Sequence, residues 1–311
     1  MTWFECKRME RVFGKPGFAN WGGNSGKVDG NCLGRWEARR RRMKTEMMKM
    51  LKRVVLLGLL IGVSLPALAA EKLIALTFDD GPRPYVLYGV KASGAASTPG
   101  MLDVLDRNGV KATFFYMGWR LTPKTWGETP HETNIGVTCL DAAHDVLRRG
   151  HEIENHTYSH ADLRIAEHKK GEAWVLGDVE RGAEAVKSVT GTKPVWLRPP
   201  DWDLPDDARQ ELERRGFRIL TISSQNPVAL RDVNSLDYLC AGKGVGCPKP
   251  SLAQSVVKAI EQREKKGVYT HVLAFHELTT TTAQLPELIG ALKAKGYRFV
   301  TVSEYMKVVK N

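Results

Sequence analysis

Two adjacent carboxylates, Asp79 and Asp80, stand where an apolar run ends at the turn Gly81-Pro82. Two histidines spaced four residues apart, His156 and His160, could supply nitrogen ligands to a divalent metal, with one of the carboxylates as a third ligand. If Asp80 binds the metal, the cation relieves the repulsion between the two acids and leaves Asp79 free to act as a base toward water. The pattern therefore predicts a metal-dependent hydrolase.

Each of these patterns also has a purely structural explanation. Asp-Gly is a common turn pair, and histidines at this spacing occur on ordinary helix faces. The extended segment 150–155 that precedes His156 favours the metal interpretation, because it would deliver both histidines to the end of a strand.

Two further residues could complete a hydrolytic site. Arg198 could hold Asp79 ionised and aligned, and Pro200 could fix the backbone so that the amide of Asp201 points at a developing oxyanion. His276 follows an apolar run and could be the general acid that protonates the leaving group. The structural alternatives are a charged strand end at Arg198 and a buried histidine at position 276.

The elements that must position these residues read as βα units around a parallel sheet, because short β-branched or aromatic runs alternate with amphipathic segments. The candidate strands are 73–78, 112–117, 150–154, 195–198, 218–222, 271–275 and 298–302, and the candidate helices are 101–108, 140–149, 173–190, 206–215, 252–265 and 285–295. The polar residues named above follow or close these strands at their carboxyl ends. In a barrel of parallel strands those ends form one rim, where active sites lie.

The positive charge of the chain is concentrated near its start. Of the net charge of +11, residues 1–69 contribute 14 Lys/Arg against 5 Asp/Glu, so the remainder is close to balanced. This distribution argues against a nucleic-acid partner, although the run Arg39–Arg42 alone could form a basic arm.

A signal peptide is predicted over residues 47–69. Basic residues precede the apolar stretch Val54–Leu65, and Pro66–Ala70 resembles a cleavage site, so we expect cleavage after Ala69. The apolar stretch is shorter than the ~20 residues of a membrane-spanning helix. We expect residues 1–46 to be a non-native or disordered extension from an over-extended start site; a cytoplasmic extension on a membrane-tethered enzyme is the rival interpretation.

Residues 70–311 are long enough for one barrel-sized domain and contain three cysteines. Cys240 and Cys247 bracket a Gly-rich loop and are the favoured disulfide pair, which leaves Cys139 reduced. A zinc knuckle is the weaker alternative, because two thiols without a nearby histidine make a poor tetrahedral site.

Taken in order, these segments resemble the polysaccharide deacetylase family, also called the NodB-homology domain or carbohydrate esterase family 4. Its first motif, TFDDGP, corresponds to Thr77–Pro82, and its second, HTxxH, to His156–His160. The third, RxPY, is matched by Arg198-Pro199-Pro200 with Asp201 in place of the usual aromatic residue. The fifth, an apolar strand ending in histidine, is Leu273–His276, and the resemblance extends from Leu73 to Val302.

The resemblance implies a single-domain α/β fold, a distorted and incomplete (β/α) barrel of about seven parallel strands. It also implies an enzyme that removes acetyl groups from amino sugars or acetylated glycans. The predicted signal peptide implies export of this enzyme to the periplasm or the extracellular space. The expected partner is the acetylated glycan alone, with membrane contact only through the signal peptide and no obligate protein partner.

The same resemblance implies a role for each site residue. Three side chains would hold one divalent ion, in the first place Zn²⁺: Asp80, His156 and His160. Asp79 would be the base, His276 the acid, and Arg198 the group that aligns the base. The remaining candidates, for binding substrate, are Pro200, Asp201 with its amide, and Trp202.

The chain departs from the family pattern in several places. The fourth motif, an Asp-Trp pair that orients the catalytic histidine, is not visible in 223–227, and Asp232 or Glu277 are the candidate substitutes. Segments 85–97 and 121–138 look like insertions at the rim. Three tryptophans could stack on sugar rings: Trp119, Trp126 and Trp202.

Two other functions remain open on the sequence alone. One is an amidase or imidase that acts on a small C–N compound with the same metal site. The other is a non-catalytic glycan-binding protein, which the missing fourth motif would explain.

Overall fold

The computed structural model describes residues 41–50, 71–89, 99–122, 137–220, 232–240 and 246–309. The chain divides into two units, Met1–Ala69 and Ala70–Asn311. In the first unit, residues 41–50 form a helix. Most of the predicted signal peptide lies outside the described residues, so it stays a prediction, and none of the described helices is long and apolar enough to cross a membrane.

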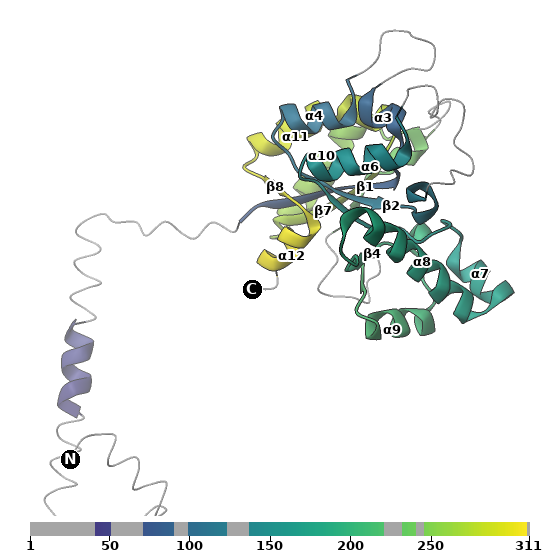
Figure 1. The fold of residues 1–311 in the computed structure, drawn as a ribbon. Coiled ribbons are helices and arrows are strands. Elements are labelled where there is room, and N and C mark those ends of the chain that lie inside the picture. Colours follow the sequence, from purple (N-terminus) through teal and green to yellow (C-terminus); the bar gives the residue numbers. More distant parts are fainter. Residues whose placement is uncertain are drawn as a thin grey trace, which may run out of the picture. The chain divides into compact units, whose positions relative to one another are not determined.

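A parallel sheet forms the centre of the second unit (Figure 1). Its order is β5-β4-β3-β2-β1-β7-β6, and β8 pairs with the start of β1. The strands are β1 (Leu73–Gly81), β2 (Thr113–Tyr116), β3 (Glu152–Asn155), β4 (Trp196–Leu197), β5 (Arg218–Ile219), β6 (Asp232–Asn234), β7 (Thr270–His276) and β8 (Arg298–Val300). Within the described residues β5 and β6 do not pair, so the barrel stays open, as predicted.

The two faces of β1 pack into different clusters because its side chains alternate. Ile74, Leu76 and Phe78 contact one layer of helices, which Figure 1 shows together on one side of the sheet: α3 (Pro84–Tyr88), α4 (Met101–Arg107), α6 (Cys139–Arg148), α10 (Leu252–Glu264) and α11 (Thr279–Ala294). Leu73 and Ala75 lie on the other face, in a cluster that includes residues of α12 (Val302–Val309).

A third cluster covers β4 and β5. It is built by α7 (Leu163–Lys170), α8 (Glu172–Thr190) and α9 (Asp206–Arg214), which pack on Leu197 and Ile219. The short helical turns are η1 (Gly118–Leu121), η2 (Pro200–Trp202) and η3 (Asp237–Cys240), and two of them, η2 and η3, follow β4 and β6 directly.

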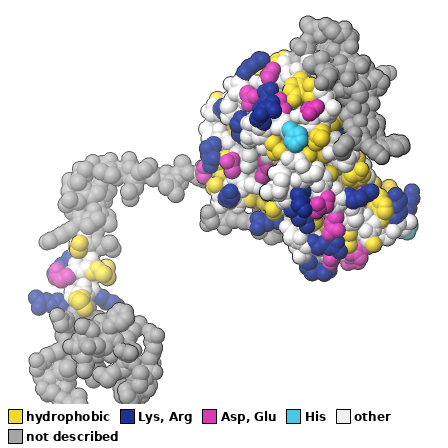
Figure 2. All heavy atoms as spheres, viewed as in Figure 1, with side chains coloured by type: hydrophobic (Ala, Val, Ile, Leu, Met, Phe, Trp, Pro, Cys, Tyr) yellow, Lys and Arg dark blue, Asp and Glu magenta, His cyan; other side chains and the backbone are white. Residues whose placement is uncertain are grey.

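The sequence predicted most elements but missed some. Strand β6 was not predicted, nor were the short helices α3, α7 and α12. Helix α11 begins at Thr279, well before the predicted start at Leu285, and Pro286 lies inside it. On the face that Figure 2 shows, Lys/Arg and Asp/Glu side chains are interspersed over the second unit, as its near-balanced charge implies.

The predicted disulfide is confirmed. Cys240 at the end of η3 is bonded to Cys247, with 4.4 Å between their Cα atoms. Cys139 at the start of α6 is a buried thiol, and its Sγ lies 3.5 Å from the carbonyl oxygen of Pro82.

One buried carboxyl makes the fold sensitive to pH. Glu154 on β3 accepts a hydrogen bond from the backbone amide of Trp196 at 2.8 Å and lies on the same strand as Glu152. Burial in the first place, and the charge of Glu152 in the second, raise the pKa of Glu154 to about 8. The folded protein therefore holds this proton more tightly than the unfolded chain does.

We predict that Glu154→Gln stabilises the protein at alkaline pH. Ionisation of Glu154 costs the folded state free energy, so the penalty is absent below the usual value of 4.5 and complete above about 8. Glutamine keeps an acceptor for the Trp196 amide and cannot ionise. Calorimetry should give a Tm above wild type at about pH 9 and a difference that vanishes at about pH 4.5; the same gain at both pH values would contradict the assignment.

Candidate active site

The three predicted metal ligands meet at the carboxyl ends of the strands. Asp80 at the end of β1 has its Oδ1 3.4 Å from Nε2 of His156 and 3.1 Å from Nε2 of His160. The three donor atoms lie within 4.8 Å of one another. His156 follows β3 directly and is buried, whereas Asp80 and His160 are half-buried. Residues separated by about eighty positions thus form one group that could hold a metal.

The donor set fits a divalent ion such as zinc. One carboxylate oxygen and two imidazole nitrogens are ligands of catalytic zinc sites, and Asp80 Oδ1 is buried with no hydrogen-bond partner among the described residues. His156 Nδ1 lies 2.6 Å from the carbonyl oxygen of Arg198, so Nδ1 carries the proton and Nε2 is left free to coordinate.

The predicted base, Asp79, is paired with a fully buried cation. Its Oδ1 lies 2.6 Å from Nη1 of Arg198, which also donates to Oγ1 of Thr77 at 2.7 Å. The Arg198 guanidinium lies over the ring of Phe115, at 4.2 Å, and over the ring of Trp202, at 4.6 Å. Arg198 therefore lies where it could align Asp79, and removal of either charge would leave the other buried and unpaired.

The predicted acid, His276, ends β7 opposite Asp79 in the strand register. Its Nδ1 is 2.7 Å from Oδ1 of Asp237, and its backbone amide donates to Oδ2 of the same carboxylate at 2.8 Å. Asp237 also accepts a hydrogen bond from Thr281 and is fully buried. Burial alone would lower the pKa of His276, but the hydrogen bond to Asp237 and the charge of Asp79 outweigh it and raise the pKa to about 9.

Asp237 takes the role for which the sequence offered Asp232 or Glu277, and both of those candidates were wrong. The missing Asp-Trp motif was sought in 223–227, after the fifth predicted strand. In the sheet, however, β7 neighbours β6, and Asp237 follows β6. The sequence signal that could have revealed it is the pair Asp237-Tyr238, in which an aromatic residue follows the aspartate as in the expected motif. The Tyr238 ring meets His276 edge-on at 5.8 Å.

Glu277 instead supports the turn that carries the two aspartates. It is fully buried, and its Oε2 accepts a hydrogen bond from the amide of Arg83 at 2.6 Å. A Cβ on Gly81 would lie 2.3 Å from Oε1 of Glu277 and 2.4 Å from the ring of Tyr116, so only glycine allows this close approach. The Gly81-Pro82 bond is cis.

The three predicted substrate-binding residues form η2, which follows β4 at the rim. Pro200 is buried, and Asp201 is exposed with its backbone in the left-handed region at φ 53°. Such conformations are enriched at functional sites. Trp202 contacts Arg198 as described above, and the roles of these residues toward substrate stay predictions. Trp119 is half-buried against Arg120, whereas Trp126 lies outside the described residues.

Comparison with known proteins identifies the family. A model named polysaccharide deacetylase matches residues 68–220, the segment that contains Asp79, Asp80, both metal-site histidines and Arg198. The chain belongs to the polysaccharide deacetylase family. This agrees with the resemblance seen in the sequence motifs.

The curated relatives of this polysaccharide deacetylase family member include fungal and bacterial proteins. A chitin deacetylase of Pestalotiopsis sp is 29% identical over 244 residues, covering 78% of this chain and 66% of the relative. A peptidoglycan-N-acetylglucosamine deacetylase of Bacillus cereus is 29% identical over 242 residues, covering 76% of this chain and 89% of the relative. Only 40% of a peptidoglycan-N-acetylglucosamine deacetylase of Listeria monocytogenes is matched.

Solved structures share the fold. A peptidoglycan deacetylase of Bacillus subtilis superposes with a TM-score of 0.52 at 23% identity, covering 78% of this chain and 92% of that one. A family 4 carbohydrate esterase of Streptomyces lividans gives a TM-score of 0.52 at 20% identity, with 75% and 94% covered.

We predict that Asp237→Asn lowers the pKa of His276 from about 9 toward its usual value of 6.5, because the carboxylate that stabilises the imidazolium is lost while the burial remains. An NMR titration of the His276 imidazole protons in the metal-free protein measures this directly. Tyr238→Phe, which keeps the ring beside His276, should leave the pKa unchanged. A pKa near 9 in Asp237→Asn would show that Asp237 does not set the charge of His276.

Proposed function

We propose that the protein is a metal-dependent deacetylase that removes acetyl groups from N-acetylated amino sugars or O-acetylated sugars of a cell-wall or extracellular polysaccharide. The observation that carries this proposal is the juxtaposition of a carboxylate and two imidazoles with a second carboxylate, Asp79, that Arg198 holds in place. Membership in the polysaccharide deacetylase family supports the reaction, and the names of the relatives support chitin-like or peptidoglycan substrates.

In the proposed reaction, Asp80, His156 and His160 would hold the ion. When bound, a divalent metal would polarise the acetyl carbonyl and make water more acidic. Asp79 takes the proton from the attacking water through the carboxylate oxygen that does not face Arg198. No covalent intermediate with the protein forms.

The remaining residues would stabilise charge and move the second proton. The amide of Asp201 donates to the oxyanion that forms on the acetyl group. His276 is protonated at neutral pH, since its pKa is raised to about 9, and its Nδ1 is engaged by Asp237. Its Nε2 is therefore the atom that delivers a proton to the departing nitrogen or oxygen. Trp202 and Pro200 would form the adjoining wall against the sugar.

The proposed location is outside the cytoplasm, in the periplasm or the extracellular space. The predicted signal peptide at 47–69 supports export, and so does the peptidoglycan named as the substrate of several relatives. The acetylated glycan is the one partner proposed. The non-catalytic alternative loses its motivation, because Asp237 and Tyr238 stand beside His276 where the fourth motif was missing.

An acetate-release screen tests the proposed reaction. The protein from residue 70 onward is incubated with chitin oligosaccharides, peptidoglycan, acetylated xylan and a panel of small cyclic amides, with added zinc or with chelator. We expect acetate from at least one glycan, loss of release with chelator and recovery with zinc. Hydrolysis of the cyclic amides without acetate release would favour the amidase instead.

We predict that two substitutions separate the base from the metal ligands. Asp79→Asn should lower kcat by about 10²–10⁴-fold, because the general base is lost, while the bound zinc stays near the wild-type amount. His156→Ala should lose both activity and zinc. Elemental analysis of the purified proteins measures the metal, and equal metal loss in the two variants would contradict the division of roles.

A further inference from the structure

The loop that carries both histidines, His156–His160, has a backbone conformation that its own sequence does not favour. Thr157 has φ 63° and His160 has φ 57°, both in the left-handed region. A β-branched residue such as threonine rarely adopts this region, and such conformations persist only where the surroundings hold them. Within the loop, the amide of His160 donates to Oγ1 of Thr157 at 3.1 Å. More contacts that hold this backbone conformation come from helix α8, outside the loop.

Helix α8 holds the middle of this loop through a buried carboxylate. Oδ2 of Asp178 accepts hydrogen bonds from the amide of Ser159 at 3.2 Å and from its Oγ at 3.0 Å. The backbone carbonyl of Asp178 accepts a third bond, from the amide of Tyr158 at 3.1 Å. Asp178 is 1% exposed, so its charge is committed to these contacts rather than to water.

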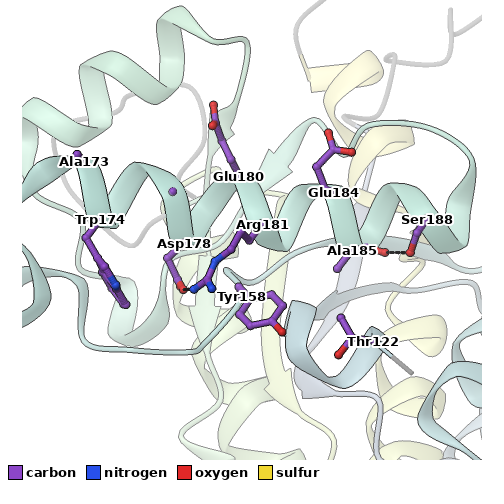
Figure 3. A pocket seen from close by; sticks show the side chains of 11 residues that line it. Thr122, Tyr158, Ala173, Trp174, Asp178, Glu180, Arg181, Glu184, Ala185 and Ser188 are labelled. Carbon is purple, nitrogen blue, oxygen red and sulfur yellow. Dashed lines mark hydrogen bonds and ion pairs between the residues drawn. The ribbon is translucent and has the colours of Figure 1, made fainter. Parts of the chain in front are cut away.

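Arg181 pairs its positive charge with the second oxygen of the Asp178 carboxylate. Its Nη2 lies 2.8 Å from Oδ1 of Asp178, and its guanidinium stacks over the ring of Tyr158 at 4.4 Å. Figure 3 shows the three side chains together beside a groove of about 800 Å³ that runs along α8. Helix α8 thus contacts the loop at Tyr158 and Ser159, which lie between the two histidines.

The backbone of α8 also lies directly against the loop at Gly182. A Cβ there would be 2.5 Å from the carbonyl carbon of Thr157 and 2.4 Å from Oδ1 of Asn155, whereas a Cβ on Gly177 of the same helix would meet nothing within 4 Å. Asn155 Nδ2 donates to the carbonyl of Val179 at 3.0 Å. Positions 178, 181 and 182 share one face of the helix.

We infer that α8 positions the loop His156–His160. Asp178 and Gly182 are positioning residues that set the separation of the two histidines, and this separation determines the affinity for the metal. Arg181 orients the Asp178 carboxylate through their contact at 2.8 Å. The inference rests on the metal site of the proposed function, but it does not depend on which bond the enzyme hydrolyses.

Zinc affinity of the metal-free protein tests the inference without any substrate. Apo wild type and Asp178→Asn are titrated with zinc against a competing chelator. The variant should bind zinc about 10–100-fold more weakly, the range found when groups that orient metal ligands are lost. The substituted amide would still occupy the site but would no longer balance the charge of Arg181.

Asp145→Asn is the matched control for this substitution. Asp145 on α6 is also a buried carboxylate, and it pairs with Arg148, three residues on, at 2.6 Å. It has no contact with the histidine loop among the interactions described. The control should lose thermal stability but keep the wild-type zinc affinity. Equal weakening in both variants would mean that general destabilisation, not loop positioning, is responsible, and would overturn the inference.

A glycine pair provides a second test that does not alter charge. Gly182→Ala should weaken zinc binding because the new methyl group displaces the Thr157 carbonyl, and Gly177→Ala should leave it unchanged. If Asp178→Asn does not fold, the glycine pair and Ser159→Ala still decide the question. Wild-type zinc affinity in folded Gly182→Ala and Ser159→Ala would overturn the inference.

The two proposals can fail separately. If wild type binds zinc, the variants bind it more weakly and no glycan releases acetate, the role of α8 is retained and the deacetylase function is refuted. A wild-type protein that does not bind zinc refutes both.

Discussion

The buried ion pair between Asp79 and Arg198 is the interaction on which the site depends. A guanidinium with no exposed surface is stable only if a carboxylate lies beside it, so Arg198 fixes Asp79 at the end of β1. The backbone of the same residue acts as well, because its carbonyl oxygen accepts the Nδ1 proton of His156. One arginine therefore contacts Asp79 with its side chain and the His156 imidazole with its main chain. Asp80 follows Asp79 directly, so the positions of Asp79, Asp80 and His156 all depend on the residue that follows the two-residue strand β4.

The groups around this centre are each held by a buried carboxyl from another element. Asp237 orients His276, Glu277 supports the turn at Gly81, and Asp178 grips the histidine loop. Each of these acids lies on a different segment from the one it supports. The concave side of the sheet thus has a polar centre at the carboxyl ends of the strands and an apolar cluster around Leu73 and Ala75 at their beginnings. This division allows charged groups to be buried where they have partners and apolar packing to carry the fold elsewhere.

The sequence predicted the fold and the residues at the centre of the candidate site because both depend on local patterns. Apolar runs of strand length alternate with amphipathic segments, and the ligands sit in short motifs at the ends of those runs. The metal group, the Asp79–Arg198 pair and the Cys240–Cys247 bridge followed from such patterns. The supporting residues did not, because their partners are distant in the sequence and a single Asp on a helix looks like a solvated side chain. Asp237 was missed for a topological reason, since no local signal says that β6 rather than β5 lies beside β7.

The Cys240–Cys247 link has a practical meaning for anyone producing the protein. Cys240 belongs to the same 3₁₀ turn as Asp237, so the covalent bond anchors the segment that contacts His276. Such bonds form in oxidising surroundings and rarely in the cytosol. Material made in a reducing host would lack this bond, and η3, which holds the hydrogen-bond partner of His276, would be without its covalent link to Cys247.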